Sequence, residues 1–120
     1  MDKAQAIYSF WSQFGLPCYD EITVPDNAPL PRLTYNNATG QVGLPIMLHA
    51  KIWYKDTSWE TISKKSDAIA AALETGQVIK IDNGYIYFYK GSPFSQTMSD
   101  AEDATIRCIY INVTAEYLTS

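Results

Sequence analysis

The pattern of hydrophobic and polar residues predicts a central amphipathic helix between Thr57 and Gly76. One apolar stripe appears when successive positions are rotated by about 100°, and it comprises Trp59, Ile62, Ser66, Ile69, Ala70 and Leu73. The spacing of Thr57 and Glu60 indicates reciprocal capping of the first turn, and Gly76 tolerates the left-handed conformation that ends many helices. We therefore expect a helix with one buried face, anchored in the core by Trp59 and Ile62.

The opposite side of this helix mixes charged residues with the alanines Ala68, Ala71 and Ala72. Alanine is a good helix former, so a solvated face is the simpler interpretation. Small side chains also let another surface approach closely, which makes a subunit contact the alternative.

Alternation of apolar and polar residues predicts strands around this helix. Residues 46–54 and 105–117 alternate with a period of two, and the second run should be a long strand near the middle of the sheet. Residues 32–38 have the pattern of a shorter strand. Residues 78–90 are typical of a hairpin, because Asn83 and Gly84 accept the positive φ angles of a tight turn.

The remaining segments are a first helix and two loops. Apolar residues recur at helical spacing within residues 4–14, and Gly15 and Pro17 then stop the helix. Residues 16–31 contain four of the six prolines, which predicts an ordered, partly extended loop. Residues 91–103 show no period, and we expect a loop that is mobile in the isolated subunit and ordered by a neighbour.

The predicted element order is α-β-β-α-β-β-β, in a single domain covering residues 1–120. This order is typical of the α+β class, here with two helices packed on one face of a largely antiparallel sheet. A chain of 120 residues that is 47% hydrophobic can form a real core without disulfides or metal.

Charge and cysteine usage exclude several classes of function. The net charge of −4 argues against a basic groove for nucleic acid. The N-terminus lacks the features of a signal peptide, and no apolar run has the length of a membrane span, so we expect a cytosolic protein without membrane association. Cys18 and Cys108 form no C-x-x-C pattern, which favours reduced thiols over a disulfide.

The residues that could support chemistry are few. His49 is the only histidine, and it lies in mid-strand on the side opposite the predicted core, which favours a surface or interface role over catalysis. Asp100, Glu102 and Asp103 could hold a hard cation, although a solvated loop is the simpler interpretation. The sequence has no phosphate-binding glycine loop and no nucleophile elbow. We therefore predict that the chain is not an enzyme and binds no cofactor or metal.

Aromatic residues are more numerous than one small core requires, with nine tyrosines and three tryptophans. The strand pattern places Trp53, Tyr87, Tyr89 and Tyr110 on the face that the predicted helices do not cover. Two interpretations stay open: a second, thinner cover by the proline-rich loop, or an intersubunit surface.

Four segments together resemble a known protein family. They are FGLPCYDEITVPDNAPLPRLTY after the first helix, WYKDTSWETISKKSDAIA, KGSPFSQTMSD and the closing IRCIYINVTAEYLT. With them, nearly the whole chain resembles the small tail terminator, or tail completion, proteins of long-tailed bacteriophages and prophages of Gram-positive bacteria. The most distinctive pair is the helix pattern SWE-x-I-SKK-x-D-x-I and the loop pattern SPF-x-Q-x-MSD, and neither has a chemical signature.

The resemblance implies an α+β subunit that closes into a ring, typically of six, on the last ring of the tail tube. Such a ring stops tube growth and offers its other surface to the head-side connector. The implied partners are further copies of the chain, the tail tube protein and the head-tail connector or stopper, while DNA passes through without specific binding. The implied location is the tail or neck of the virion, after assembly in the host cytoplasm, and no catalytic residue is implied.

The interface candidates for such a ring are Ala68, Ala71, Ala72, Tyr87, Tyr89, Tyr110, Phe94 and Met98. A ring that passes DNA should have a neutral to acidic lumen, because basic residues would bind phosphates. Asp100, Glu102 and Asp103 would line it if their loop faces inward; alternatively, they only solubilise an outer loop. Other functions that stay open are a connector stopper, a cytosolic α+β ligand-binding or regulatory domain, and a small hydrolase using His49.

Overall fold

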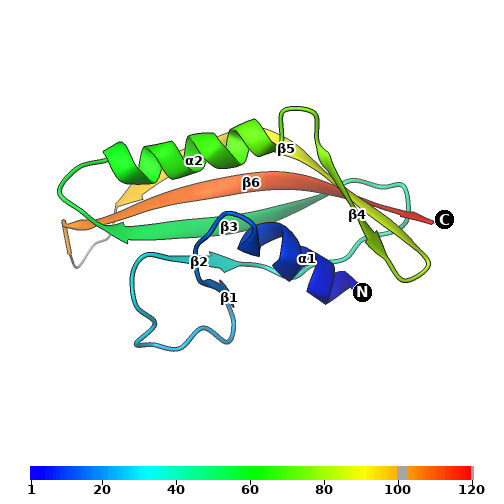
Figure 1. Cartoon of the computed structure of the whole chain (residues 1–120), viewed down its shortest axis with the longest axis horizontal. Coiled ribbons are helices and arrows are strands. Elements are labelled where there is room, and N and C mark those ends of the chain that lie inside the picture. The colour runs from blue at the N-terminus through cyan, green and yellow to red at the C-terminus, as the bar shows by residue number, and fades with distance from the viewer. Residues whose placement is uncertain (100–102, 120) are drawn as a thin grey trace.

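The computed structural model describes residues 1–99 and 103–119 of the chain, and within them two helices and six strands form one sheet-based fold (Figure 1). In chain order the elements are α1 (Lys3–Ser12), β1 (Cys18–Asp20), β2 (Arg32–Tyr35), β3 (Ile46–Lys55), α2 (Glu60–Ala72), β4 (Gln77–Ile81), β5 (Gly84–Ser99) and β6 (Ile106–Thr119).

The strands form a mixed sheet in the order β1-β2-β3-β6-β5-β4. β1 runs parallel to β2, and each of the other neighbouring pairs is antiparallel. The predicted α+β class is confirmed, and β6 lies inside the sheet as expected. The predicted element order is wrong at β1, because three residues in a proline-rich segment are too few to show alternation and a parallel edge strand needs no hairpin signal.

β5 continues far beyond the predicted hairpin. Residues 91–99 were expected to form a loop, but Ser95–Ser99 pair with residues 107–111 of β6. Between Lys90 and Ser95 the register shifts, so that residues 91–94 lie opposite only Asn112, whose side-chain amide donates to the Pro93 carbonyl oxygen at 3.0 Å. This bulge interrupts the period of two, and the exposure of Ser95–Ser99 on both faces removes the hydrophobic alternation.

One hydrophobic core joins the sheet to both helices. The register places the inward-facing side chains of neighbouring strands side by side, for example Leu48 beside Val113 and Ala50 beside Ile111, all fully buried. The ring of Phe10 in α1 stacks on the ring of Phe88 in β5, with 4.3 Å between centroids. In α2, Ile62 and Ile69 are fully buried in the same core. Figure 1 shows α2 running along β5 and β6.

The start of α2 differs from the predicted capping pattern. The helix begins at Glu60 rather than Thr57, and its N-cap residue, Trp59, makes no capping bond through its side chain. The Ser58 hydroxyl instead accepts from the backbone N–H of Glu60 at 3.1 Å, and Asp56 accepts from the N–H of Ser58 at 3.0 Å. The reciprocal bonds expected between Thr57 and Glu60 are therefore replaced by an earlier turn.

The predicted anchors of α2 are buried to different degrees. Ile62 is fully buried, whereas Trp59 is half-buried at the edge of the core with the Arg107 guanidinium 5.1 Å above its ring. At the other end, Gly76 has a φ of +80°, the left-handed conformation that the sequence predicts. Neither helix in the described residues is long and apolar enough to span a membrane.

Both cysteines are thiols, as their spacing predicts. Cys18 is half-buried on β1, and its Sγ lies 3.2 Å from the Leu16 carbonyl oxygen as a donor. Burial raises the pKa of the Cys18 thiol to about 11. The thiol therefore stays protonated, and unreactive as a nucleophile, at neutral pH.

Tyr117 ties the end of β6 to the segment between β2 and β3. Its ring is 1% exposed and its hydroxyl donates to the Ala38 carbonyl oxygen at 2.7 Å. Tyr117→Phe removes this donor and should lower the free energy of unfolding by about 1 kcal/mol in urea titrations at neutral pH.

The same substitution should change the response to alkali. Burial raises the pKa of the Tyr117 phenol above its ordinary value of 10.0. The protonated hydroxyl thus contributes stability that is fully present below about pH 10 and is lost as pH rises through the folded-state pKa. Tyr117→Phe should therefore lose less stability than the wild type as the pH rises above about 10. Equal losses in Tyr117→Phe and the wild type would contradict the assignment.

Candidate functional site

The side of the sheet opposite the core carries the surplus aromatic residues. We call this side the outer face, and it is formed by the side chains that alternate with the buried ones in β2, β3, β5 and β6. Its members include Thr34, His49, Lys51, Trp53, Tyr87, Tyr89, Tyr110 and Asn112. Apart from Thr34, which is buried, these side chains are half-buried, so they form a surface intermediate between core and solvent.

His49 connects the outer face to the segment after β1. Its Nε2 atom lies 3.0 Å from Oε2 of Glu21, and its ring stacks on Tyr110 with 5.3 Å between centroids. Glu21 fixes the orientation of the imidazole while Tyr110 covers one side of it. These contacts describe a histidine that joins a loop to the sheet, although a histidine paired with a carboxylate also has the components of a proton-transfer pair.

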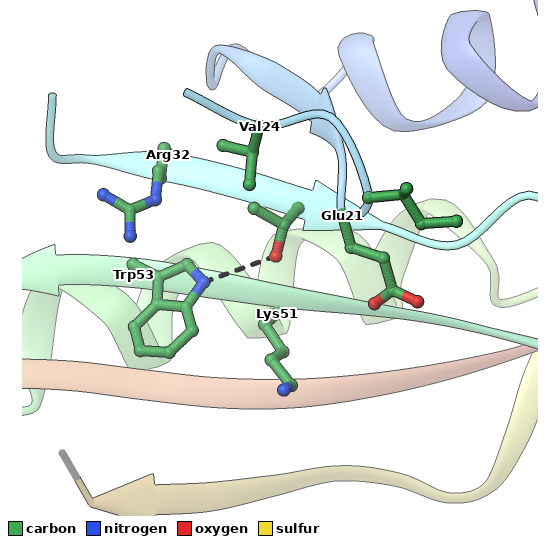
Figure 2. Close-up of a pocket in the computed structure, with 7 residues that line it drawn as sticks. Glu21, Val24, Arg32, Lys51 and Trp53 are labelled. Carbon is green, nitrogen blue, oxygen red and sulfur yellow. Dashed lines mark hydrogen bonds between the residues drawn. The ribbon is translucent and has the colours of Figure 1, made fainter. Parts of the chain in front are cut away.

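A cleft lies beside this pair, between the segment after β1 and strands β2 and β3 (Figure 2). Its volume is about 460 Å³, and it is lined by Glu21, Ile22, Val24, Arg32, Thr34, Lys51 and Trp53. Alternation in β3 turns Lys51 and Trp53 outward, and the antiparallel register places Thr34 opposite Lys51 and Arg32 opposite Trp53. The cleft is therefore built on two strands and closed on one side by an irregular segment.

Arg32 is held in place by two neighbours. Its Nη1 atom donates to the Ala28 carbonyl oxygen at 2.8 Å, and its guanidinium carbon lies 5.5 Å from the centre of the Trp53 ring. Trp53 in turn donates through Nε1 to the Thr34 hydroxyl at 3.4 Å, the dashed line in Figure 2. The Nε atom of Arg32 is buried and has no hydrogen-bond partner within the described residues.

The proline-rich segment covers only part of the outer face. Ile22 and Val24, from this segment, line the same cleft as Trp53. Tyr87 and Tyr89 lie further along the sheet, with 5.1 Å between their ring centroids. The pKa of Tyr89 is raised, first by burial and then by the nearby Glu116 carboxylate. Of the two interpretations of the aromatic surplus, cover by the proline-rich segment therefore applies to Trp53.

The interface candidates fall on separate parts of the surface. Ala68 and Ala71 are exposed on α2 and Ala72 is half-buried, while Tyr87, Tyr89 and Tyr110 belong to the outer face. Met98 is 37% exposed on β5, opposite Cys108, and Phe94 is half-buried in the bulge of β5 and packs against the core. The structure thus brings Tyr87 and Tyr89 together but does not join the alanines to the tyrosines.

Of the three acidic lumen candidates, Asp100 and Glu102 lie outside the described residues. Asp103 accepts from the Thr105 hydroxyl at 2.6 Å and from the Thr105 N–H at 2.8 Å, and its Oδ2 atom lies 3.7 Å from Nζ of Lys55. The hydroxyl bond, then the backbone bond, lowers the pKa of Asp103. Asp103 therefore shapes the turn that enters β6. Within residues 1–99 and 103–119, no group of three or more His, Cys, Asp and Glu side chains is placed to hold a metal ion.

Sequence reasoning did not identify the cleft. The outward positions of Lys51 and Trp53 follow from strand alternation, but Glu21, Ile22 and Val24 come from an irregular segment whose path no periodic pattern predicts. Arg32 stands at the start of a short predicted strand, and no pattern in the sequence marks it as a site residue.

No protein-family model, curated protein or solved structure matches this chain. The resemblance to tail terminators therefore rests on the sequence segments quoted above.

Proposed function

We propose that this chain is a structural assembly protein of a long-tailed phage or prophage, of the tail terminator type. It would form a ring, of six subunits in the typical case, that caps the tail tube, ends its polymerisation and joins the tail to the head-side connector or stopper. It would assemble in the host cytoplasm and stay in the neck of the virion. The proposal includes no catalytic step and no cofactor.

The observation that carries this proposal is the open edge of β5. β4 pairs with β5 only from Gly84 to Phe88, so the edge of residues 89–99 that faces away from β6 has no strand beside it among the described residues. The five residues Ser95–Ser99 are exposed and carry no charge. Unpaired, uncharged strand edges pair readily with other chains, so a protein that keeps one has reason to cover it with a partner.

The distribution of the interface candidates gives a second argument. We infer that α1 and α2 cover the same face of the sheet, since the side chains that both helices bury belong to one core cluster with the inward-facing residues of the strands. The alanines of α2 and the tyrosines of the outer face then lie on different sides of the subunit. A ring joined head to tail requires two different patches on each subunit, which is the arrangement that these candidates offer.

The proposal extends to the lumen of the ring. A neutral to acidic lining would let DNA slide, because each lysine or arginine on a phosphate adds a salt-dependent attraction. Asp103, together with Asp100 and Glu102 next to it in the sequence, is the acidic group that would contribute if the segment between β5 and β6 faces inward.

Tails made without the protein provide the decisive test. Deletion of its gene from an inducible prophage should give overlong or headless tails in negative-stain electron micrographs, and the wild-type gene supplied in trans should restore normal particles. Tails of normal length joined to heads in the deletion strain would contradict the proposal.

A pair of matched variants tests the role of the β5 edge. Thr97→Lys places a charge on the open edge, whereas Thr39→Lys places the same charge at an exposed position between β2 and β3, in a segment that contains no interface candidate. Both should fold with similar thermal midpoints, but only Thr97→Lys should fail to restore normal tails and should shift any ring seen by light scattering towards monomer. Equal behaviour of the two variants would exclude the edge as an interface.

A further inference from the structure

We propose that the cleft between β2, β3 and the segment after β1 binds an acidic segment of a partner protein, in which a carboxylate side chain stands next to an apolar one. The geometry that supports this site is complete within one subunit. The inference therefore does not depend on ring formation and would hold for a monomer.

The charges that line the cleft indicate that its ligand carries a carboxylate. Within the described residues, neither Arg32 nor Lys51 forms an ion pair, although both line the cleft. The only acidic residue in the lining, Glu21, is engaged with His49 at 3.0 Å. Two cations thus face a cleft whose single carboxylate is already occupied, in a chain with a net charge of −4. This local excess of positive charge complements a carboxylate, which accepts charge-assisted hydrogen bonds from lysine and arginine.

The side chain of Arg32 is already held in position in the free protein, which also favours binding of a carboxylate. The bond to Ala28 and the contact with Trp53 hold the guanidinium of Arg32 before any ligand arrives. A side chain that is already fixed loses less conformational entropy on binding, so more of the interaction energy appears as affinity. The segment after β1 is likewise fixed to the sheet by the contact between Glu21 and His49.

The apolar part of the ligand follows from the apolar residues of the lining. Ile22, which is 87% exposed, Val24 and Trp53 are the three apolar residues of the lining. A carboxylate alone would leave these apolar side chains exposed to water, whereas an aliphatic or aromatic neighbour in the ligand would cover part of them. Tryptophan and arginine are also the residues most enriched among the energetic centres of protein interfaces.

The composition of the lining favours a protein segment over a small molecule. Four of the seven lining residues are polar or charged, namely Glu21, Arg32, Thr34 and Lys51. Sites for small molecules are lined mainly by apolar side chains and enclose most of the ligand. An aromatic residue surrounded by polar and charged residues is instead typical of a contact between two proteins.

The test is a titration of the full ¹⁵N-labelled chain with short peptides, followed by NMR. The probe is a blocked tetrapeptide of alternating glutamate and leucine, and the control replaces each glutamate by lysine. The glutamate peptide should shift the indole Nε1–H signal of Trp53 and the amides around Lys51 in a saturable way, with a dissociation constant of about 1 mM or below. The lysine peptide should leave these signals unchanged.

Variants show whether the cleft is responsible. Lys51→Gln should weaken binding of the glutamate peptide about tenfold, because it removes one charged hydrogen-bond donor. Lys80→Gln removes the same charge from an exposed position on β4 and should bind like the wild type. Ile22→Ser should weaken binding of the glutamate peptide while leaving any response to acetate unchanged, because it removes one apolar side chain and no charge.

Three outcomes would overturn the proposal. The first is the absence of a saturable shift at Trp53 with the glutamate peptide. The second is an equal effect of Lys51→Gln and Lys80→Gln on binding. The third is an affinity for sodium acetate or inorganic phosphate that equals the affinity for the peptide, which would show a site for small anions instead.

Discussion

Phe10→Ala should lower the free energy of unfolding by about 3 to 5 kcal/mol, most of the stability of a small domain. Phe10 is fully buried at the point where α1 meets the sheet. Its ring stacks on Phe88 at 4.3 Å and makes edge contacts with Trp11 at 4.9 Å and Phe14 at 5.6 Å. Removing the ring therefore leaves a cavity bordered by three other aromatic rings, which are too rigid to fill it.

Urea unfolding followed by circular dichroism measures this loss. Tyr8→Ala is the matched control, because Tyr8 is an aromatic residue of the same helix that is 49% exposed, and its removal should cost about 0.5 kcal/mol or less. If Phe10→Ala does not fold, Phe10→Leu retains most of the volume and should show an intermediate loss. Equal losses in Phe10→Leu and Tyr8→Ala would place α1 outside the cooperative core.

The elements that sequence analysis predicted are those with a single buried face. In β3 and β6, the inward series Leu48, Ala50, Ile52 and Ile109, Ile111, Val113 alternates with polar or half-buried residues, because only one side of the sheet packs on the core. The same one-sided burial produces the helical spacing of Phe10 and its neighbours in α1. The periodicity of the sequence therefore predicts an element wherever one of its faces is buried and the other is exposed to solvent.

The elements that it missed lack this contrast. Residues 95–99 of β5 are exposed on both faces, so their strand is specified by backbone pairing with β6 and not by side-chain burial. The bulge at residues 91–94 also changes which side chains face inward. β1 is too short for a pattern, and the start of α2 depends on a local choice between Ser58 and Thr57 as acceptor, which their similar side chains do not distinguish.

The candidate cleft could be predicted only by half. Strand alternation turns Lys51 and Trp53 away from the core, so the sequence alone predicts that both lie on the same face of the sheet. Glu21 and Arg32 reach them through a segment with several prolines, whose path depends on tertiary contacts such as the bond from Arg32 to Ala28. Sites built partly on irregular backbone can be recognised only in the folded structure.

Gly76→Ala should lower the free energy of unfolding by about 2 to 5 kcal/mol, from two separate causes. The first is backbone strain, because Gly76 has a φ of +80°, where a residue with a Cβ atom is disfavoured. The second is overlap, since a Cβ atom built here would lie 2.7 Å from the Tyr87 hydroxyl oxygen and 2.9 Å from the ring carbon that bears it. Gly76, which lies between α2 and β4, thus leaves the space that the Tyr87 ring of β5 occupies.

Gly43 separates these two causes. It has almost the same φ, +81°, but no atom lies within 4 Å of the position that a Cβ would occupy. Gly43→Ala should therefore lose only the strain energy, about 1 to 2 kcal/mol, and the difference between the two variants in urea unfolding measures the overlap with Tyr87. In the background Tyr87→Ala the ring is absent, so Gly76→Ala should then cost no more than Gly43→Ala. An undiminished cost in that background would mean that the contact between Gly76 and Tyr87 does not set the position of the ring, and that the geometry of the turn alone requires the glycine.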